Sequence, residues 1–326
     1  MNRKACDFFG VEVECFRDLE KPNTKTPALF TTTTDGSISD PNGEGVEFIS
    51  NKIAFADKKA VSQFKKGLDK IAQNHFVNRT CGLHIHLNLP LNYLFKRQRL
   101  KKMLVAYRLF EPSFFSFVSH SRRHNSFCRR LSEFNAFRDF NKLIKEDVWD
   151  LWGLFFEYNS LLDKVGKRKI IADKIAQSHS KSANFRYLFI NLQSIFYHGS
   201  LEVRLHQATT DKTKIWNWLQ LHKKFLLKIF SWKFTLKDLV KLYEKYGQEA
   251  LWKIVEDEKL KEYYTKKAVE FGKLRDTHKS YNIKIAEAYL KKESCNAKIP
   301  QETNGDITED GIETEDSEER EIPESD

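Results

Sequence analysis

Short segments in which apolar and polar residues alternate constrain the fold of this chain most strongly. Consecutive strand residues point to opposite faces of a sheet, so each segment predicts a strand with one apolar and one polar face. The alternation is strict in residues 10–15, 82–89 and 201–206, and residues 46–50 suggest a fourth strand. The polar positions of these four segments are Glu12, Glu14, Glu47, His84, His86, Asn88, Glu202, Arg204 and His206.

Helical periodicity accounts for much of the remaining sequence. Residues 57–75 and 96–111 place apolar side chains at helical spacing, and a longer helix is predicted from Asp211, whose carboxylate suits the N-cap position. Further helices are predicted at 235–246, 249–272 and 280–292. Helices that cover the apolar face of a single sheet define the α+β class, which we therefore expect here.

The polar face of the predicted sheet favours a chemical role. Many antiparallel sheets leave one face in solvent, and such faces are typically rich in Thr, Lys, Ser and Gln. Here the face repeats Glu, His and Arg instead. Glu12 and Glu14 are two residues apart on a strand, so their carboxylates lie about 7 Å apart and can hold two neighbouring cations or flank one.

The donor types of this face favour a hard cation. Together with Glu47, Glu202 and an imidazole, the pair offers oxygen ligands and little sulfur, which suits Mg²⁺ or Mn²⁺ better than Zn²⁺. Arg204 adds a positive charge that a substrate phosphate could use. Metals and an arginine on one sheet face indicate phosphoryl chemistry on a nucleotide.

A zinc-dependent hydrolase is the rival metal hypothesis. It takes His84, His86 and one carboxylate as the three ligands of a catalytic zinc. This hypothesis explains fewer residues, because the pair Glu12 and Glu14 and the pair Glu202 and Arg204 would then have no role.

The charge distribution raises a non-catalytic alternative, a nucleic-acid-binding protein. Residues 301–326 hold twelve acidic side chains and one basic side chain, a net charge of −11, which leaves +21 for the rest of the chain. The basic residues are spread over predicted helix surfaces, and no RNA- or DNA-binding motif accompanies them, so we expect no nucleic-acid partner. The acidic segment has few large apolar residues, which predicts a disordered tail over 294–326.

Cysteine usage and hydropathy indicate a cytoplasmic protein. The five cysteines are scattered and odd in number, so we expect reduced thiols rather than a disulfide framework. The sequence has no run of about 18 apolar residues and no apolar segment near its N-terminus, so neither a membrane span nor a secretory signal is expected.

Six motifs in a fixed order carry a resemblance to a known family. They are G-x-E-x-E (10–14), D-G-S (35–37), G-V-E-x-x-S (45–50), C-G-L-H-I-H (81–86), R-Y-x-x-x-N (186–191) and L-E-V-R-L-H-Q-A-T (201–209). The series resembles the amidoligase family, part of the carboxylate-amine ligase group related to glutamine synthetase and γ-glutamylcysteine ligase, over residues 7–225. The chain departs at Ala208, where Gly is usual, and lacks the Pro expected after Ser50.

The resemblance implies a curved antiparallel sheet of the glutamine synthetase-like type that binds ATP and Mg²⁺ (or Mn²⁺) on its concave face. A substrate carboxylate would take the γ-phosphoryl group, and an amine would then displace phosphate to form an amide. The implied metal ligands are Glu12, Glu14, Glu47, Glu202 and one of His84 and His86. The remaining implied roles are phosphate stabilisation by Arg204, amine binding and deprotonation by Asp35, and lining of the nucleotide or substrate site by Arg186 and Asn191.

The sequence thus predicts a catalytic domain over 1–293, with its motifs in 7–225 and a helical extension over 234–293. Its expected partners are a carboxylate substrate and an amine substrate, whose identities the sequence does not indicate. The basic segment 119–125, with Arg122 and Arg123, could clamp a carboxylate or phosphate, although a solvated loop is the default expectation.

Overall fold

A computed structural model describes residues 5–19, 25–34, 38, 43–89, 97–133, 187–191 and 194–273. All of these belong to one compact unit, Met1–Cys295. The strands are β1 (Phe8–Asp18), β2 (Phe30–Thr33), β3 (Gly43–Ser50), β4 (Ile53–Ala54), β5 (His75–Phe76), β6 (Gly82–Asn88), β7 (Ile190–Asn191) and β8 (Ser200–Gln207). The helices are α1 (Lys58–Asn74), α3 (Arg97–Ser116), α4 (His120–Arg123), α10 (Ser194–His198), α11 (Lys212–Phe230), α12 (Leu236–Tyr246), α13 (Ala250–Val255) and α14 (Glu258–Lys273), with 3-10 turns at Leu131–Glu133 and Gly247–Glu249.

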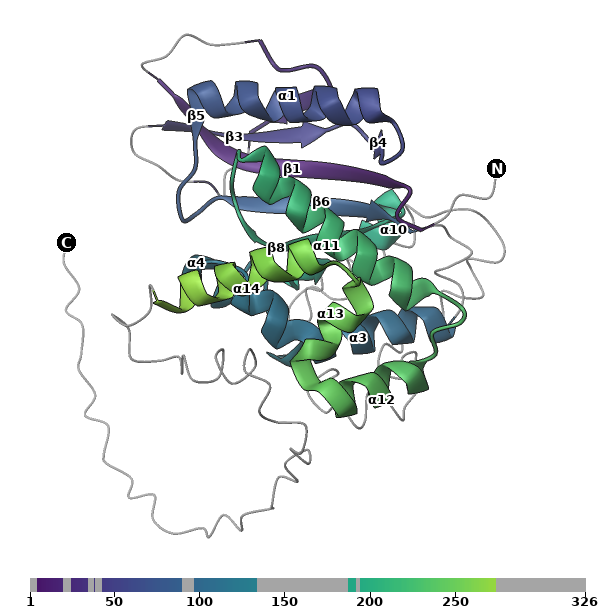
Figure 1. Ribbon diagram of the computed structural model, residues 1–326. Helices are drawn as coiled ribbons and strands as arrows, with labels where there is room; N and C mark the ends of the chain where they lie inside the picture. Colours follow the sequence, from purple (N-terminus) through teal and green to yellow (C-terminus); the bar gives the residue numbers. More distant parts are fainter. Residues whose placement is uncertain are drawn as a thin grey trace, which may run out of the picture. The chain divides into compact units, whose positions relative to one another are not determined.

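The strands form one curved antiparallel sheet in the order β2-β3-β1-β6-β8-β7. Figure 1 shows β3, β1, β6 and β8 in this order. β1 is its longest strand and pairs with β3 on one side and with β6 on the other. The short strands β4 and β5 also pair with β1. Segments that are far apart in the sequence therefore become neighbours, and β1, β6 and β8 lie next to one another in the middle of the sheet.

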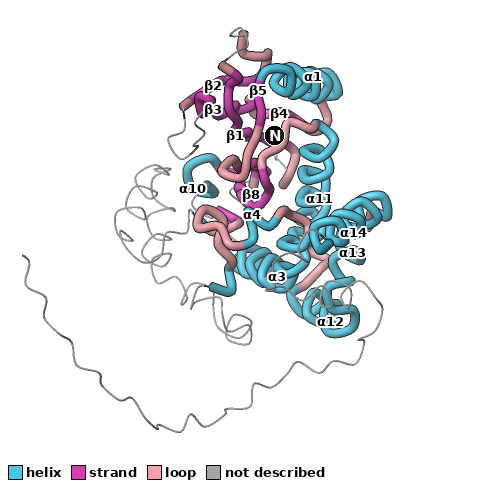
Figure 2. Tube along the Cα trace, turned by 90° about the vertical axis from the view of Figure 1, so that its left-hand side faces the viewer, coloured by secondary structure: helices cyan, strands magenta, loops and turns pink. Residues whose placement is uncertain are grey.

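Helices cover one face of this sheet, which confirms the predicted mixed architecture. Figure 2 shows α1 and α11 on the same side of the strands. The carboxylate of Asp57 caps α1 by accepting a hydrogen bond from the backbone of Ala60, and Asp211 caps α11 as the sequence predicted. The buried stripe of α1 packs in the same core as Val11 and Val13 of β1. The apolar positions of the alternating strands thus face the helices.

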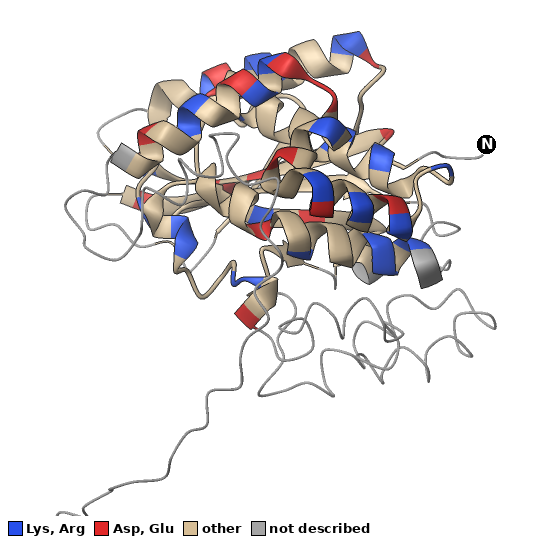
Figure 3. Ribbon diagram, turned by 60° about the horizontal axis from the view of Figure 1, so that its bottom comes forward, with Lys and Arg blue, Asp and Glu red and all other residues tan. Residues whose placement is uncertain are grey.

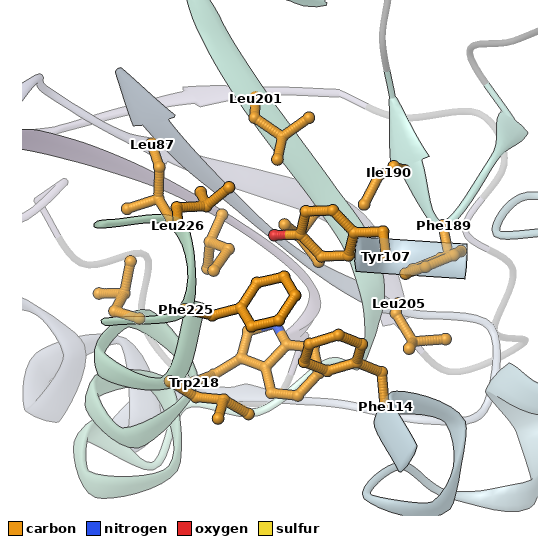
Figure 4. Packing of buried hydrophobic residues seen from close by; sticks show 14 of the residues in the cluster. Leu87, Tyr107, Phe114, Phe189, Ile190, Leu201, Leu205, Trp218, Phe225 and Leu226 are labelled. Carbon is orange, nitrogen blue, oxygen red and sulfur yellow. The ribbon is translucent and has the colours of Figure 1, made fainter. Parts of the chain in front are cut away.

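Aromatic side chains fill the core between α3, α11 and the sheet. Figure 4 shows Tyr107 and Phe114 from α3 beside Trp218 and Phe225 from α11, below Leu201 of β8. The rings of Phe114 and Phe225 meet edge to face with their centroids 5.3 Å apart. Large rings in such tilted contacts bury much apolar area, which fixes α3 and α11 against the sheet.

The predicted helix over 249–272 is two helices. The chain leaves α13 at Glu256, which has a left-handed backbone with φ 53°, and α14 begins after Asp257, whose carboxylate accepts a hydrogen bond from the backbone of Leu260. A left-handed residue ends a helix, and an aspartate at the next position caps a new one. The predicted helix over 280–292 and the predicted tail over 294–326 lie outside the described residues.

The alternation predicted that His206 lies on the polar face of the sheet, but the structure places it on the other face. Leu83 of β6 pairs with His206, but Ile85 pairs with Val203, so a β-bulge places one extra residue in β8. The extra residue reverses the alternation, and the His206 ring packs on Trp218 with their centroids 5.1 Å apart. Burial lowers the pKa of this histidine to about 4.

Basic and acidic residues are interspersed on the helices, as Figure 3 shows in one view. Some lysines pair with neighbouring carboxylates, for example Lys224 with Asp257 at 3.1 Å and Lys228 with Glu256 at 2.5 Å. Within the part of the chain that the structure describes, no helix has both the length and the apolar character needed to cross a membrane.

Candidate active site

The candidate active site lies on the sheet face opposite α1 and α11, across β3, β1, β6 and β8. The strand register brings the acidic and imidazole side chains of these strands together. The paired positions are Glu14 with Glu47, Glu12 with His84, and His86 with Glu202. Residues paired across antiparallel strands share a face, so four separate segments of the chain contribute to one polar cluster.

Glu12 lies at the centre of this cluster. One of its carboxylate oxygens, Oε2, is 3.1 Å from Nδ1 of His84, and the other, Oε1, is 3.0 Å from Nε2 of His86. The other ring nitrogen of His86, Nδ1, is 3.1 Å from the hydroxyl of Ser200 and 3.3 Å from that of Ser194. The two hydroxyls fix the ring orientation, so Nε2 of His86 faces Glu12.

Glu202 is buried between two donors. Its Oε1 is 2.5 Å from Nη1 of Arg204, and its Oε2 accepts a hydrogen bond of 2.6 Å from Nδ2 of Asn191. The Arg204 Nε–H points the other way, toward the carbonyl oxygen of Phe127 at 3.3 Å. Arg204 therefore lies at the edge of the acidic cluster, with its guanidinium held from two sides.

Glu14 is held by backbone as well as by an imidazole. The backbone N–H of Gly82 donates to its Oε2 at 2.6 Å, and Nε2 of His84 lies 3.4 Å from its Oε1. His84 thus lies between two carboxylates, those of Glu12 and Glu14. Its side chain is buried, so this arrangement is fixed by packing.

The neighbours of Glu12 and Glu202 keep these two carboxylates ionised. Burial alone would raise the pKa of Glu12, but hydrogen bonds from His84 and His86 outweigh it and hold that pKa well below its usual range. Burial would also raise the pKa of Glu202, but His86, His84 and Arg204 lower it. The pKa of His86 shifts upward, because its bond to Glu12 and the charges of Glu12 and Glu202 exceed the effect of burial.

Two overlapping sets of side chains could each hold a cation. Glu12, His86 and Glu202 form one set, and Glu12, Glu47 and His84 form the other. Within each set the candidate ligand atoms lie within 4.8 Å of one another. Carboxylate oxygens predominate, and this donor type fits Mg²⁺ or Mn²⁺. Glu14 lies outside both sets, beside His84.

The structure brings most of the predicted site residues together. The predicted metal ligands converge on one sheet face, and Arg204 joins them. Asn191 bonds Glu202, so it holds an acidic side chain of the site. Asp35 and Arg186 lie outside the described residues, and their roles stay predictions.

Sequence reasoning missed Ser200 and was wrong about the surroundings of Arg122 and Arg123. Ser200 lies two positions before Glu202, so the same alternation could have identified it. Arg122 and Arg123 are buried, which contradicts the default expectation of a solvated loop. Their hydrogen bonds go to backbone carbonyl groups, those of Arg204 and Leu205 for Arg122. Nothing in the local sequence pattern around 119–125 signals these contacts.

The fold and the site define an α+β protein with an acidic cluster and a neighbouring guanidinium on the polar face of its sheet. This chain belongs to the family described as "Putative amidoligase enzyme", which matches residues 4–226. Family membership indicates an enzyme that forms amide bonds. A search among curated proteins found no match for this chain.

Proposed function

We propose that this protein is an ATP- and Mg²⁺-dependent ligase that joins a carboxylate to an amine through an acyl phosphate. We also propose that its sheet is of the glutamine synthetase-like type. The observation that carries the proposal is the pair of overlapping ligand sets that share Glu12, next to Arg204. A triphosphate bound by divalent cations would need both oxygen ligands for the cations and a positive side chain for the phosphoryl group.

Different residues of the site would bind the cations and stabilise the phosphoryl group. Glu12, Glu202 and His86 would hold one cation, and Glu47 and His84 would complete a second site with Glu12. Bound Mg²⁺ would neutralise charge on the triphosphate. Arg204 would stabilise the charge of the transferred phosphoryl group while the substrate carboxylate attacks it and ADP leaves. The amine would then attack the acyl carbon, and phosphate would leave as the amide forms.

The buried position of these groups supports phosphoryl transfer. Glu14, Glu202 and His84 are each less than a tenth exposed. Ionised carboxylates that face one another are costly in a buried site unless positive charges balance them. In the protein without cations, His86 and Arg204 supply part of this balance, as their contacts with Glu12 and Glu202 indicate.

The proposal is tested by ATP binding and by amine-dependent phosphate release. Titration calorimetry would measure the binding of ATP with and without Mg²⁺. A screen of amino acids, polyamines and peptides, each paired with candidate carboxylates, would measure phosphate release. We expect ATP to bind only with Mg²⁺ and phosphate release to require an amine. ATP binding that is absent or independent of Mg²⁺ would contradict the proposal, and zinc detected by elemental analysis would favour the hydrolase alternative.

A further inference from the structure

Arg122 makes a long-range contact that its sequence context does not suggest. It lies in α4, and its side chain is buried. Its Nη2 donates to the carbonyl oxygen of Arg204 at 2.7 Å, and its Nε lies 3.4 Å from that of Leu205. A buried guanidinium therefore bonds two successive carbonyl groups of β8.

These two carbonyl groups belong to the β-bulge. Leu83 pairs with His206 and Ile85 with Val203, so Arg204 and Leu205 together oppose the single residue between Leu83 and Ile85. A bulge leaves backbone groups outside the regular ladder of hydrogen bonds, and buried carbonyl groups need donors. Arg122 supplies those donors.

The bulge determines where the neighbouring side chains point. With it, Arg204 bonds Glu202 on the acidic face, while His206 packs on Trp218 in the core. A regular strand would put Arg204 and His206 on the same face, because their positions differ by two. Arg204 would share the face of Glu202 in a regular strand as well, so it is His206 that the bulge turns into the core. For Arg204, the bulge sets the local backbone position from which its side chain reaches Glu202.

The segment that carries Arg122 also holds the side chain of Arg204. The carbonyl oxygen of Phe127 accepts a hydrogen bond from Nε of Arg204 at 3.3 Å. A hydrogen bond within the same segment joins Cys128 to Arg122, since the Sγ of Cys128 donates to the carbonyl oxygen of Arg122 at 3.2 Å. Residues 119–128, which we call the arginine-holding segment, therefore contact both the backbone and the side chain of Arg204.

We propose that Arg122 is a positioning residue, which stabilises the β8 bulge and so fixes the backbone from which Arg204 reaches Glu202 and the transferred phosphoryl group. This inference rests on the proposed function for the role of Arg204, but the effect on the bulge can be measured without any substrate.

Arg123 provides a matched control. It follows Arg122 in α4 and is also buried. Its guanidinium bonds two backbone carbonyl groups as well, those of Val118 at 2.9 Å and Ser116 at 3.1 Å. These carbonyl groups lie at the end of α3 and just beyond it, and neither belongs to β8. Removing either guanidinium deletes comparable hydrogen bonds, but only Arg122 acts on Arg204.

The test compares Arg122→Gln with Arg123→Gln by hydrogen exchange and by kinetics. For Arg122→Gln we expect protection of the amides at 203–207 to fall about tenfold or more. We expect kcat for amine-dependent phosphate release to fall about 100-fold, with KM for ATP nearly unchanged, because a misplaced guanidinium mainly affects the transition state. Arg123→Gln should lose protection at 114–118 and keep kcat within about twofold.

Arg122→Lys provides a second variant in case Arg122→Gln does not fold. Lysine keeps the positive charge, but its ammonium group lacks the planar arrangement of donors with which a guanidinium bonds two carbonyl groups. Amide protection at 203–207 and kcat should therefore both lie between those of the wild-type protein and those of Arg122→Gln. Unchanged protection at 203–207 in the folded Arg122 variants, or an equal loss of kcat in Arg123→Gln, would overturn the inference. If the wild-type protein released no phosphate, the proposed function would fail, and the exchange data would still decide the role of Arg122.

Discussion

His86 and Glu12 meet across the sheet although 74 positions separate them in the sequence, with Nε2 of His86 3.0 Å from Oε1 of Glu12. The opposite side of the His86 ring is held by Ser200 at 3.1 Å. The ring is therefore fixed before any ligand arrives. A site whose ligands are oriented in advance loses little conformational entropy on binding, which suits catalysis by positioned charges.

Removing the charge at the centre of the cluster tests its role. In Glu12→Gln, an amide replaces the carboxylate that both candidate ligand sets share. We expect turnover of ATP to fall at least about 100-fold while the melting temperature changes little, because the amide keeps the shape of the side chain. Steady-state phosphate release and thermal unfolding would measure the two effects.

The matched control is Glu44→Gln on the neighbouring strand β3. Glu44 is more than half exposed and pairs with Arg17 at 2.6 Å, away from the acidic cluster. The same change of charge there should leave turnover unaltered. Equal losses in both variants would point to a general electrostatic effect and would speak against a special role for Glu12.

Gly82 keeps space open inside the site. A methyl group at this position would lie 3.1 Å from Nη2 of Arg122, 3.1 Å from Nε2 of His84 and 3.3 Å from Oε2 of Glu14. These atoms must move apart in Gly82→Ala, so we expect the variant to fold and to bind Mn²⁺ about tenfold more weakly. Gly10→Ala is the control, because its new methyl group would meet only Cβ of His86 at 3.6 Å. Similar Mn²⁺ affinity in both variants would refute this steric prediction.

The buried pair Tyr107 and His222 contributes to stability. The Tyr107 hydroxyl is 3.1 Å from Nδ1 of His222, and Nε2 of His222 is buried with no partner among the described residues. In Tyr107→Phe the imidazole would lose the one hydrogen-bond partner that it has among the described residues, at a cost of about 1–3 kcal/mol in the free energy of unfolding. The double variant Tyr107→Phe/His222→Phe should regain part of that loss. Urea unfolding measures both, and strictly additive losses would contradict the coupling.

Two buried histidines predict acid sensitivity. Burial lowers the pKa of His222 to about 3 and that of His206 to about 4, whereas an unfolded histidine titrates near 6.5. As the pH falls below about 6.5, the unfolded chain therefore binds protons that the folded protein cannot take up. The free energy of unfolding should fall with decreasing pH, by up to about 1.4 kcal/mol per pH unit for each histidine.

The variant His222→Phe isolates one of these contributions. Between pH 6 and about 4.5 its free energy of unfolding should depend less steeply on pH, by about 1.4 kcal/mol per unit. Tyr107→Phe serves as the comparison, because it perturbs the same part of the core and keeps the imidazole. A slope in His222→Phe equal to that of the wild-type protein would show that His222 is not buried in its neutral form.

The sequence predicted the acidic face because strand alternation is a local property. Glu12 and Glu14 share a face of β1 whatever the neighbouring strands are, and the same holds for His84 and His86 on β6. The pairing of Glu14 with Glu47 is not local, since it depends on which strand lies beside β1 and in which register. Neither the alternation nor the motif order fixes that register, since the resemblance implies only that Glu47 is a metal ligand.

The failures of prediction also have physical causes. His206 was placed on the wrong face because the bulge depends on Arg122, which is distant in the sequence. Strands of two residues, such as β4 and β7, are too short to show any period. The interruption between α13 and α14 was readable in principle, because Asp257 precedes α14 and caps it.

Binding of Mn²⁺ to the ligand-free protein tests the central claim most directly. The electron paramagnetic resonance signal of free Mn²⁺ decreases as the ion binds, and Mg²⁺ should restore it by competition. We predict saturable loss of the signal with the wild-type protein and none with the double variant Glu12→Gln/Glu202→Gln, which retains its fold by circular dichroism. An undiminished signal with the wild-type protein, or an equal loss with the double variant, would contradict a cation site at these carboxylates.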